Sequence, residues 1–312
     1  MTRRHLQLAI GILWLLDGIF QLQPKMFTAA FANNVILPAA SGQPTFVSLP
    51  IHWFVSLFLL NPTLFNSLVV VAQLSIGVLI LNKKTVKIGL ITSVFWGLLV
   101  WIIGEGYGGI FSGQFSLLMG APGAAIIYSL LAVAAYPSIK VDRVYWLALV
   151  WSFVWIVGAV FFVFNQHSIS SVATITRQGV VGAPNWLAAI DNHVASFIGG
   201  QGGRSDGNMP GMSMLGAKES TYWIIILFGL AELFIGIGIF LRGTIRKMAI
   251  ITGSLLLFVF WVIGQGLGGF YSGLMTDLNT APLLILLGVY LFSSDIDNDL
   301  ATISDKIKAV II

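Results

Sequence analysis

The chain has 312 residues, of which 57% are hydrophobic and only 9% are charged, and its formal net charge is +4. A soluble domain usually has about a quarter of its residues charged, so this composition, with a mean hydropathy of +0.92, excludes that class. The few basic residues fall in short connections, which excludes a nucleic-acid-binding stripe. Cysteine is absent, so the chain itself carries no disulfide, thiol redox centre or iron–sulfur cluster. We therefore expect an all-α polytopic protein embedded in the lipid bilayer.

Apolar runs near the roughly 20 residues that a membrane-spanning helix needs recur along the whole chain. The first run follows Thr2, Arg3 and Arg4 without a convincing cleavage site, so we expect it to remain as an anchor and not to be removed as a signal peptide. We predict eight transmembrane helices, over residues 6–22, 64–81, 86–103, 117–136, 144–164, 222–241, 248–263 and 281–292.

Basic residues set the predicted orientation, because cytoplasmic connections are enriched in lysine and arginine. Twelve of the 16 basic residues fall on one side of the predicted helices: Arg3, Arg4, Lys83, Lys84, Lys87, Lys140, Arg143, Arg242, Arg246, Lys247, Lys306 and Lys308. This predicts a multi-pass protein of the cell membrane with both termini in the cytoplasm. The long loops 23–62 and 165–221 are then extracytoplasmic, and their segments 51–60 and 186–198 should lie in the outer interface.

An internal repeat divides the chain. Residues 101–113, WIIGEGYGGIFSG, recur as residues 261–273, WVIGQGLGGFYSG, and eight of the thirteen positions are identical. Each copy leads to an Ala-Pro pair, at Pro122 and at Pro282. We predict two parallel four-helix repeats, residues 1–140 and 141–293, with an outer loop inserted at 199–219 and an amphipathic cytoplasmic tail at 294–312.

The repeated motif is rich in glycine, which permits positive φ and close backbone approach. It contains G-x-G-x-x-G, but it follows a membrane helix and not a strand, so we exclude a dinucleotide fingerprint. Glu105 and Gln265 occupy the same motif position and are candidates to face a shared outer cavity. The alternative is that the motif is only a tight corner between helices.

The segment Ala231-Glu232-Leu233-Phe-Ile-Gly236, followed by the basic turn 242–247, resembles the second helix of the DoxX-like membrane protein family. Residues 9–18, AIGILWLLDG, resemble the start of the same fold. The resemblance implies a four-helix bundle, present here as a tandem duplication. It also implies membership of a quinone-linked redox complex with partner subunits, as in the DoxD-type small subunit of thiosulfate:quinone oxidoreductase.

Four further residues are candidates for binding a substrate or cofactor. Asp17 and Glu232 lie within predicted membrane helices, where an acid suggests function, although either can instead be a hydrogen-bonded structural residue. His52 and His193 are repeat partners in the outer segments, where paired histidines can hold haem, copper or a quinone carbonyl. They can equally be an inherited pair of capping residues.

Three thioethers in the outer loop, Met209, Met212 and Met214, form a candidate Cu(I) site, or they contact lipid or partner subunits. No nucleophile–base pair is present, so we predict no catalytic residue and leave open whether the protein is an enzyme. The leading hypothesis is a membrane subunit of a quinone-linked redox complex that binds a small molecule or partner at an outer cavity. The alternatives are a small-solute or copper transporter and a purely structural accessory subunit.

Overall fold

A computed structural model describes residues 1–113, 115–137, 145–164, 183–199 and 213–294. Over these residues the chain forms helices and turns without any strand, which confirms the predicted all-α class. The longer helices are α1 (Arg3–Phe20), α3 (Thr45–Leu60), α4 (Pro62–Leu81), α5 (Val86–Ile103), α6 (Ala124–Ala135), α7 (Tyr145–Phe164), α9 (Asn185–Gly199), α10 (Ser213–Gly238), α11 (Thr244–Ile263) and α12 (Thr280–Phe292).

Four helices, α4, α5, α7 and α11, are long and apolar enough to cross a membrane. Each of the other four predicted spans also contains a helix, but α6 and α12 have only 12 and 13 residues. At 1.5 Å per residue these two are roughly 18–20 Å long, shorter than a hydrocarbon core of about 30 Å. The structure thus supports a membrane protein with four candidate spans among its described helices.

Two predicted boundaries are wrong. The helix expected from residue 117 begins at Ala124, because Gly120 and Gly123 adopt φ values of 96° and 109° that interrupt it. Helix α10 begins at Ser213 and not at residue 222, so the end of the expected 199–219 loop is helical. The rest of that loop and the tail from residue 295 lie outside the described residues.

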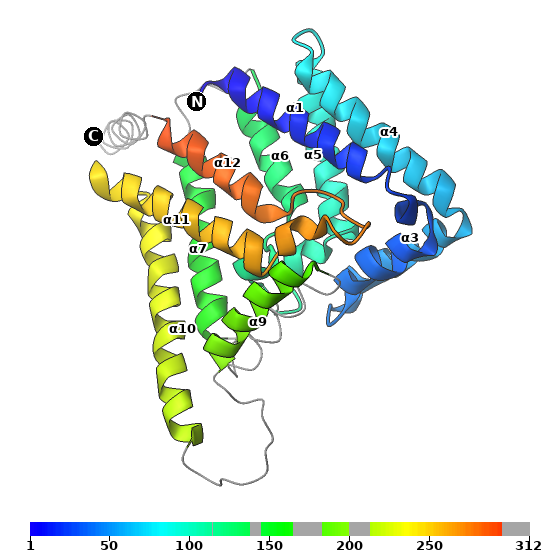
Figure 1. Cartoon of the computed structure of the whole chain (residues 1–312). Helices are drawn as coiled ribbons and strands as arrows, with labels where there is room; N and C mark the ends of the chain where they lie inside the picture. Colours follow the sequence, from blue (N-terminus) through cyan, green and yellow to red (C-terminus); the bar gives the residue numbers. More distant parts are fainter. Residues whose placement is uncertain (114, 138–144, 165–182, 200–212, 295–312) are drawn as a thin grey trace.

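The helices of the two halves pack in the same pattern. Helix α1 packs on α4 as α7 packs on α10, and α5 packs on α6 as α11 packs on α12, while α6 and α12 join the halves (Figure 1). The α1–α4 contact is close because glycines form it: a Cβ on Gly77 would lie 2.8 Å from the carbonyl oxygen of Gly11. Large aromatic side chains, among them Trp14, Tyr128 and Trp155, belong to one buried core with residues from both halves.

Arginines cap several helices at one end of the bundle. Arg4 donates to the carbonyl of Leu81 at the end of α4 (2.6 Å), and Arg3 donates to that of Pro137 beyond α6 (2.7 Å). Arg246 donates to the carbonyl of Ile239 after α10 (2.9 Å). Cations stabilise the negative ends of helices in this way. We call this the basic end; it holds the starts of α1 and α11 and the ends of α4, α6 and α10.

Candidate functional site

The two copies of the repeated motif form turns of the same shape, which we call the first corner (residues 101–113) and the second corner (261–273). Tyr107 and Leu267 adopt φ values of 58° and 54°, and the glycine after each has φ of 62° and 72°. A non-glycine residue with positive φ is uncommon, so its recurrence at the same motif position shows that the conformation belongs to the motif.

Each corner is tied to the next helix by two equivalent hydrogen bonds. The indole nitrogens of Trp101 and Trp261 donate to the carbonyls of Pro122 (2.7 Å) and Leu278 (2.8 Å). The carboxyl group of Glu105 accepts from the Ala125 N–H at 3.1 Å. In the second corner the amide oxygen of Gln265 accepts from the Ala281 N–H at 3.2 Å. Glu105 and Gln265 therefore satisfy the free N–H groups at the starts of α6 and α12.

These bonds show that the two Ala-Pro pairs are not equivalent positions. Pro122 precedes α6 and accepts the tryptophan bond, whereas Pro282 lies within α12. The connection after the first corner is longer, and its residues 116–121 cross to the second half, where the Leu117 carbonyl accepts from Gln265 (3.0 Å). In return residues 276–280 reach the first half, where the Thr280 hydroxyl donates to the Gly120 carbonyl. We call these stretches the first and second crossing segments.

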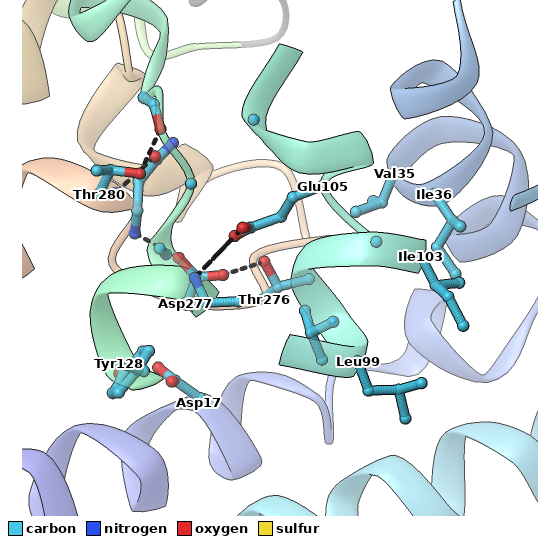
Figure 2. A pocket seen from close by; sticks show the side chains of 18 of the residues that line it. Asp17, Val35, Ile36, Leu99, Ile103, Glu105, Tyr128, Thr276, Asp277 and Thr280 are labelled. Atoms are coloured by element: carbon cyan, nitrogen blue, oxygen red, sulfur yellow. Dashed lines mark hydrogen bonds between the residues drawn. The ribbon is translucent and has the colours of Figure 1, made fainter. Parts of the chain in front are cut away.

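A cavity of about 590 Å³ lies in the first half, at the end away from the basic end. Helices α1, α4, α5 and α6 line it together with the first corner, and the second crossing segment closes it. One wall of the cavity is apolar and includes the side chains labelled Val35, Ile36, Leu99 and Ile103 in Figure 2. Leu68 and Leu99 line the same wall and are 56% and 47% exposed on the outside of α4 and α5. The apolar wall therefore reaches the outer surface of the helices.

The opposite wall of the cavity is polar and acidic. Figure 2 shows Asp17 beside Tyr128, and the phenol donates a hydrogen bond to this carboxyl group. Glu105 and Asp277 face the same space from the first corner and the second crossing segment. Among the described residues, no lysine, arginine or histidine lines the cavity. The cavity is thus an amphipathic chamber with three carboxyl groups at one side.

The acids outside the helices have altered proton affinities. The pKa of Glu105 is raised from 4.5 to about 8, chiefly because the group is buried and next because Asp277 is close, while the N–H groups of Ala125 and Ala124 oppose the shift. Burial also raises the pKa of Asp277, against hydrogen bonds from Thr276 and the Asn279 N–H. Perturbed carboxyl groups that meet in a cavity are typical of functional sites.

The remaining predicted site residues lie elsewhere. Gln265 and Glu232 are buried outside the cavity, and Glu232 faces Gly158 near the first crossing segment. His52 and His193 lie on exposed faces of α3 and α9, and the His193 ring forms a hydrogen bond with the Ala189 carbonyl of its own helix (2.7 Å).

The predicted copper ligands Met209 and Met212 lie outside the described residues, and Met214 lies in α10 at a position where only the backbone is described. In the described part of the chain, no group of three or more histidine or acidic side chains is arranged to hold a metal. The structure therefore brings together Asp17 and Glu105 from the predicted set, and not the histidines.

Sequence reasoning missed the other polar groups of the cavity. Asp277 lies in a connection just before a predicted helix, where an acid gives no signal. Tyr128 and Trp96 look like ordinary helix residues, and Gln21 falls at the end of the first predicted span. The spacing of Asp17 and Gln21 could have indicated that both belong to one polar site, because residues four apart share one face of a helix.

No protein-family model, curated protein or solved structure matches the chain.

Proposed function

We propose that this chain is an integral membrane protein that binds a small lipid-soluble molecule in the amphipathic cavity. The observation that carries the proposal is the pairing of an apolar wall that reaches the surface of α4 and α5 with a buried polar wall. Small-molecule sites are concave and mostly apolar, with a few convergent polar groups. A ligand dissolved in the bilayer would enter past Leu68 and Leu99 and place its polar group at Asp17.

The test is to fill the cavity. Val100 lies on the lining face of α5. We expect Val100→Phe to lower or eliminate the amount of a small molecule that co-purifies with the wild-type protein, as measured by mass spectrometry of organic extracts. Val259→Phe is the matched control, because Val259 is exposed on α11 and does not line the cavity. An equal amount of ligand in wild-type protein and in Val100→Phe would refute the proposal.

The narrower form of the proposal is a subunit of a quinone-linked redox complex, as the resemblance to the DoxX-like family implies. The size of the chamber and its apolar wall support a ring with a lipid tail. His52 and His193, exposed on α3 and α9, are then surface positions where a partner subunit would bind. Native mass spectrometry of the complex purified from its own membrane would identify such a partner.

A second candidate, a transporter of small solutes, is favoured by the acids of the lining, since every charged residue that the structure describes there is acidic. A carboxyl group placed in a protein interior is typical of cation and proton pathways. Flux into liposomes that contain the purified protein, compared with empty liposomes, measures this activity.

The predicted orientation has a direct test. The Lys84 and Gly243 turns lie at the basic end, and Gly269 lies in the second corner at the other end of α11. Because the chain has no cysteine, single cysteines at these three positions have no background. We expect impermeant maleimide to label positions 84 and 243 from the cytoplasmic side and position 269 from the opposite side. Labelling of 84 and 243 from different sides would contradict the parallel arrangement of the halves.

A further inference from the structure

Three buried oxygen atoms of the cavity wall have no hydrogen-bond partner among the described residues. They are Oδ1 of Asp17, Oε1 of Gln21 and Oε1 of Gln73. Their side chains are 1%, 2% and 6% exposed, and all three line the cavity. A buried acceptor without a donor is costly, since it has lost water and gained nothing in exchange. Trp96 Nε1, a donor of the same cavity, also has no partner among the described residues. A bound molecule that carries several N–H groups can satisfy the three oxygen atoms.

The backbone holds these three acceptors close together. Asp17 lies in α1 and Gln21 follows directly after its last residue with helical backbone angles, so the two residues, four apart, lie on the same side. Gln73 comes from α4, which packs tightly on the same stretch of α1, since a Cβ on Gly18 would lie 3.1 Å from the backbone nitrogen of Leu74. The cluster is thus built by two helices that pack closely against each other.

The charges around the cluster have one sign. Asp17, Glu105 and Asp277 all line the cavity, and no basic side chain among the described residues does so. An anionic ligand would find no basic partner among the described residues of the lining. A cation would instead compensate the acids, because an opposite charge favours the ionised form of a carboxyl group.

Aromatic rings surround the same space. Trp14 stacks on Tyr128 with ring centroids 4.3 Å apart, and Trp96 and Phe65 also line the cavity. Rings of this kind attract organic cations through their electron-rich faces. A primary ammonium group carries three N–H donors and no acceptor, which matches the three free acceptors in number.

We propose that the ligand of this cavity is a lipophilic primary amine, whose ammonium group donates to Asp17, Gln21 and Gln73 and whose hydrocarbon part lies along the apolar wall. This inference depends on the proposed function, because it names the ligand of the same cavity. It identifies the chemistry by which the site distinguishes its ligand from other apolar molecules of the membrane.

The experiment compares four probes of equal chain length with the protein in lipid nanodiscs, corrected with empty nanodiscs: hexylamine, hexanol, hexanoate and hexyltrimethylammonium. We expect hexylamine, which is protonated at pH 7, to bind at least about tenfold more tightly than hexanol, since it makes a charge-assisted contact in a buried site. Hexanoate should not bind. Hexyltrimethylammonium keeps the charge but has no N–H donor, so it should bind more weakly than hexylamine.

Asp17→Asn should weaken hexylamine binding by about tenfold or more and leave hexanol binding unchanged, because the amide keeps the shape of the carboxyl group without its charge. Glu232→Gln is the matched control, since Glu232 is a buried helix acid outside the cavity, and it should change neither probe.

Four results would overturn the inference. If hexanol binds as tightly as hexylamine, or if a short-chain benzoquinone binds while hexylamine does not, the amine is wrong and the cavity still functions as a ligand site. If hexyltrimethylammonium binds as tightly as hexylamine, the match of three donors to three acceptors is wrong. If no probe binds and Val100→Phe changes nothing, the proposed function fails as well.

Discussion

Replacing Gly108 with alanine will destabilise the protein far more than the same replacement at Gly243. Both glycines have positive φ, 62° and 64°, so both alanines carry the same backbone strain of about 1–2 kcal/mol. A Cβ at Gly243 would meet nothing within 4 Å, whereas a Cβ at Gly108 would overlap the backbone carbonyl of Pro122. We expect Gly243→Ala to cost about 1 kcal/mol and Gly108→Ala about 4 kcal/mol or more, at the upper end for single substitutions.

Thermal unfolding in one lipid or detergent system measures both effects. Gly268→Ala gives an intermediate case, because its φ of 72° is similar and its Cβ would lie 3.0 Å from the Asp277 carbonyl oxygen. We expect Gly243→Ala to have the highest unfolding temperature of the three variants, Gly268→Ala an intermediate one and Gly108→Ala the lowest. Equal losses of stability at all three positions would mean that backbone strain alone determines the effect of each substitution. The close contact of the first corner with Pro122 would then not contribute.

Replacing Glu105 with glutamine will make the protein more stable at pH 8 and leave it nearly unchanged at pH 5. The carboxyl group has a pKa near 4.5 when the chain is unfolded and about 8 when it is folded. Below pH 4.5 both states hold the proton. Between pH 4.5 and 8 the folded state keeps a proton that the unfolded state releases, so stability falls as pH rises, and above pH 8 it levels off.

The second corner shows that the substitution fits. Gln265 has the position of Glu105 and accepts the equivalent helix N–H at 3.2 Å, so glutamine should keep the bond to Ala125 without the ionisable group. The pKa shift sets an upper limit of roughly 5 kcal/mol. Exposure of Glu105 to the cavity reduces this value, and we expect about 2 kcal/mol at pH 8.

Unfolding midpoints of both proteins at pH 5, 6.5 and 8 provide the measurement. The wild-type midpoint should decrease across this range and that of Glu105→Gln should decrease much less, with the remaining slope due to other buried acids such as Asp277. Parallel curves for the two proteins would show that Glu105 is already ionised in the folded state.

Much of the fold could be predicted from apolar runs, because a membrane helix requires a long hydrophobic segment. The bounds of α5 match the predicted residues 86–103, and α7 and α11 differ by a few residues. The start of α6 could not be predicted in this way. The residues around the start of α6 are mostly apolar, so an apolar run does not locate the start. Gly120 and Gly123 have positive φ values, which depend on tertiary contacts, and the helix begins only after them.

The candidate site was predictable only in part, and the reason is geometric. Asp17 and Glu105 were noticed because acids are rare in apolar sequence. The sequence does not show that the connections after the two corners cross between the halves, because the pairing of Thr280 with Gly120 and of Gln265 with Leu117 joins distant residues. The histidines at equivalent positions suggested a shared site, but they lie on separate exposed faces.

The exchange of crossing segments has a consequence for biosynthesis. Because the chain leaves the ribosome from its N-terminus, the helices around the cavity are inserted long before residues 276–280 exist. The chamber thus stays unfinished until residues 276–280 have been made, and the ligand that we propose can be held there only after that point. We expect a chain that ends after α11 to be inserted and yet unable to hold this ligand.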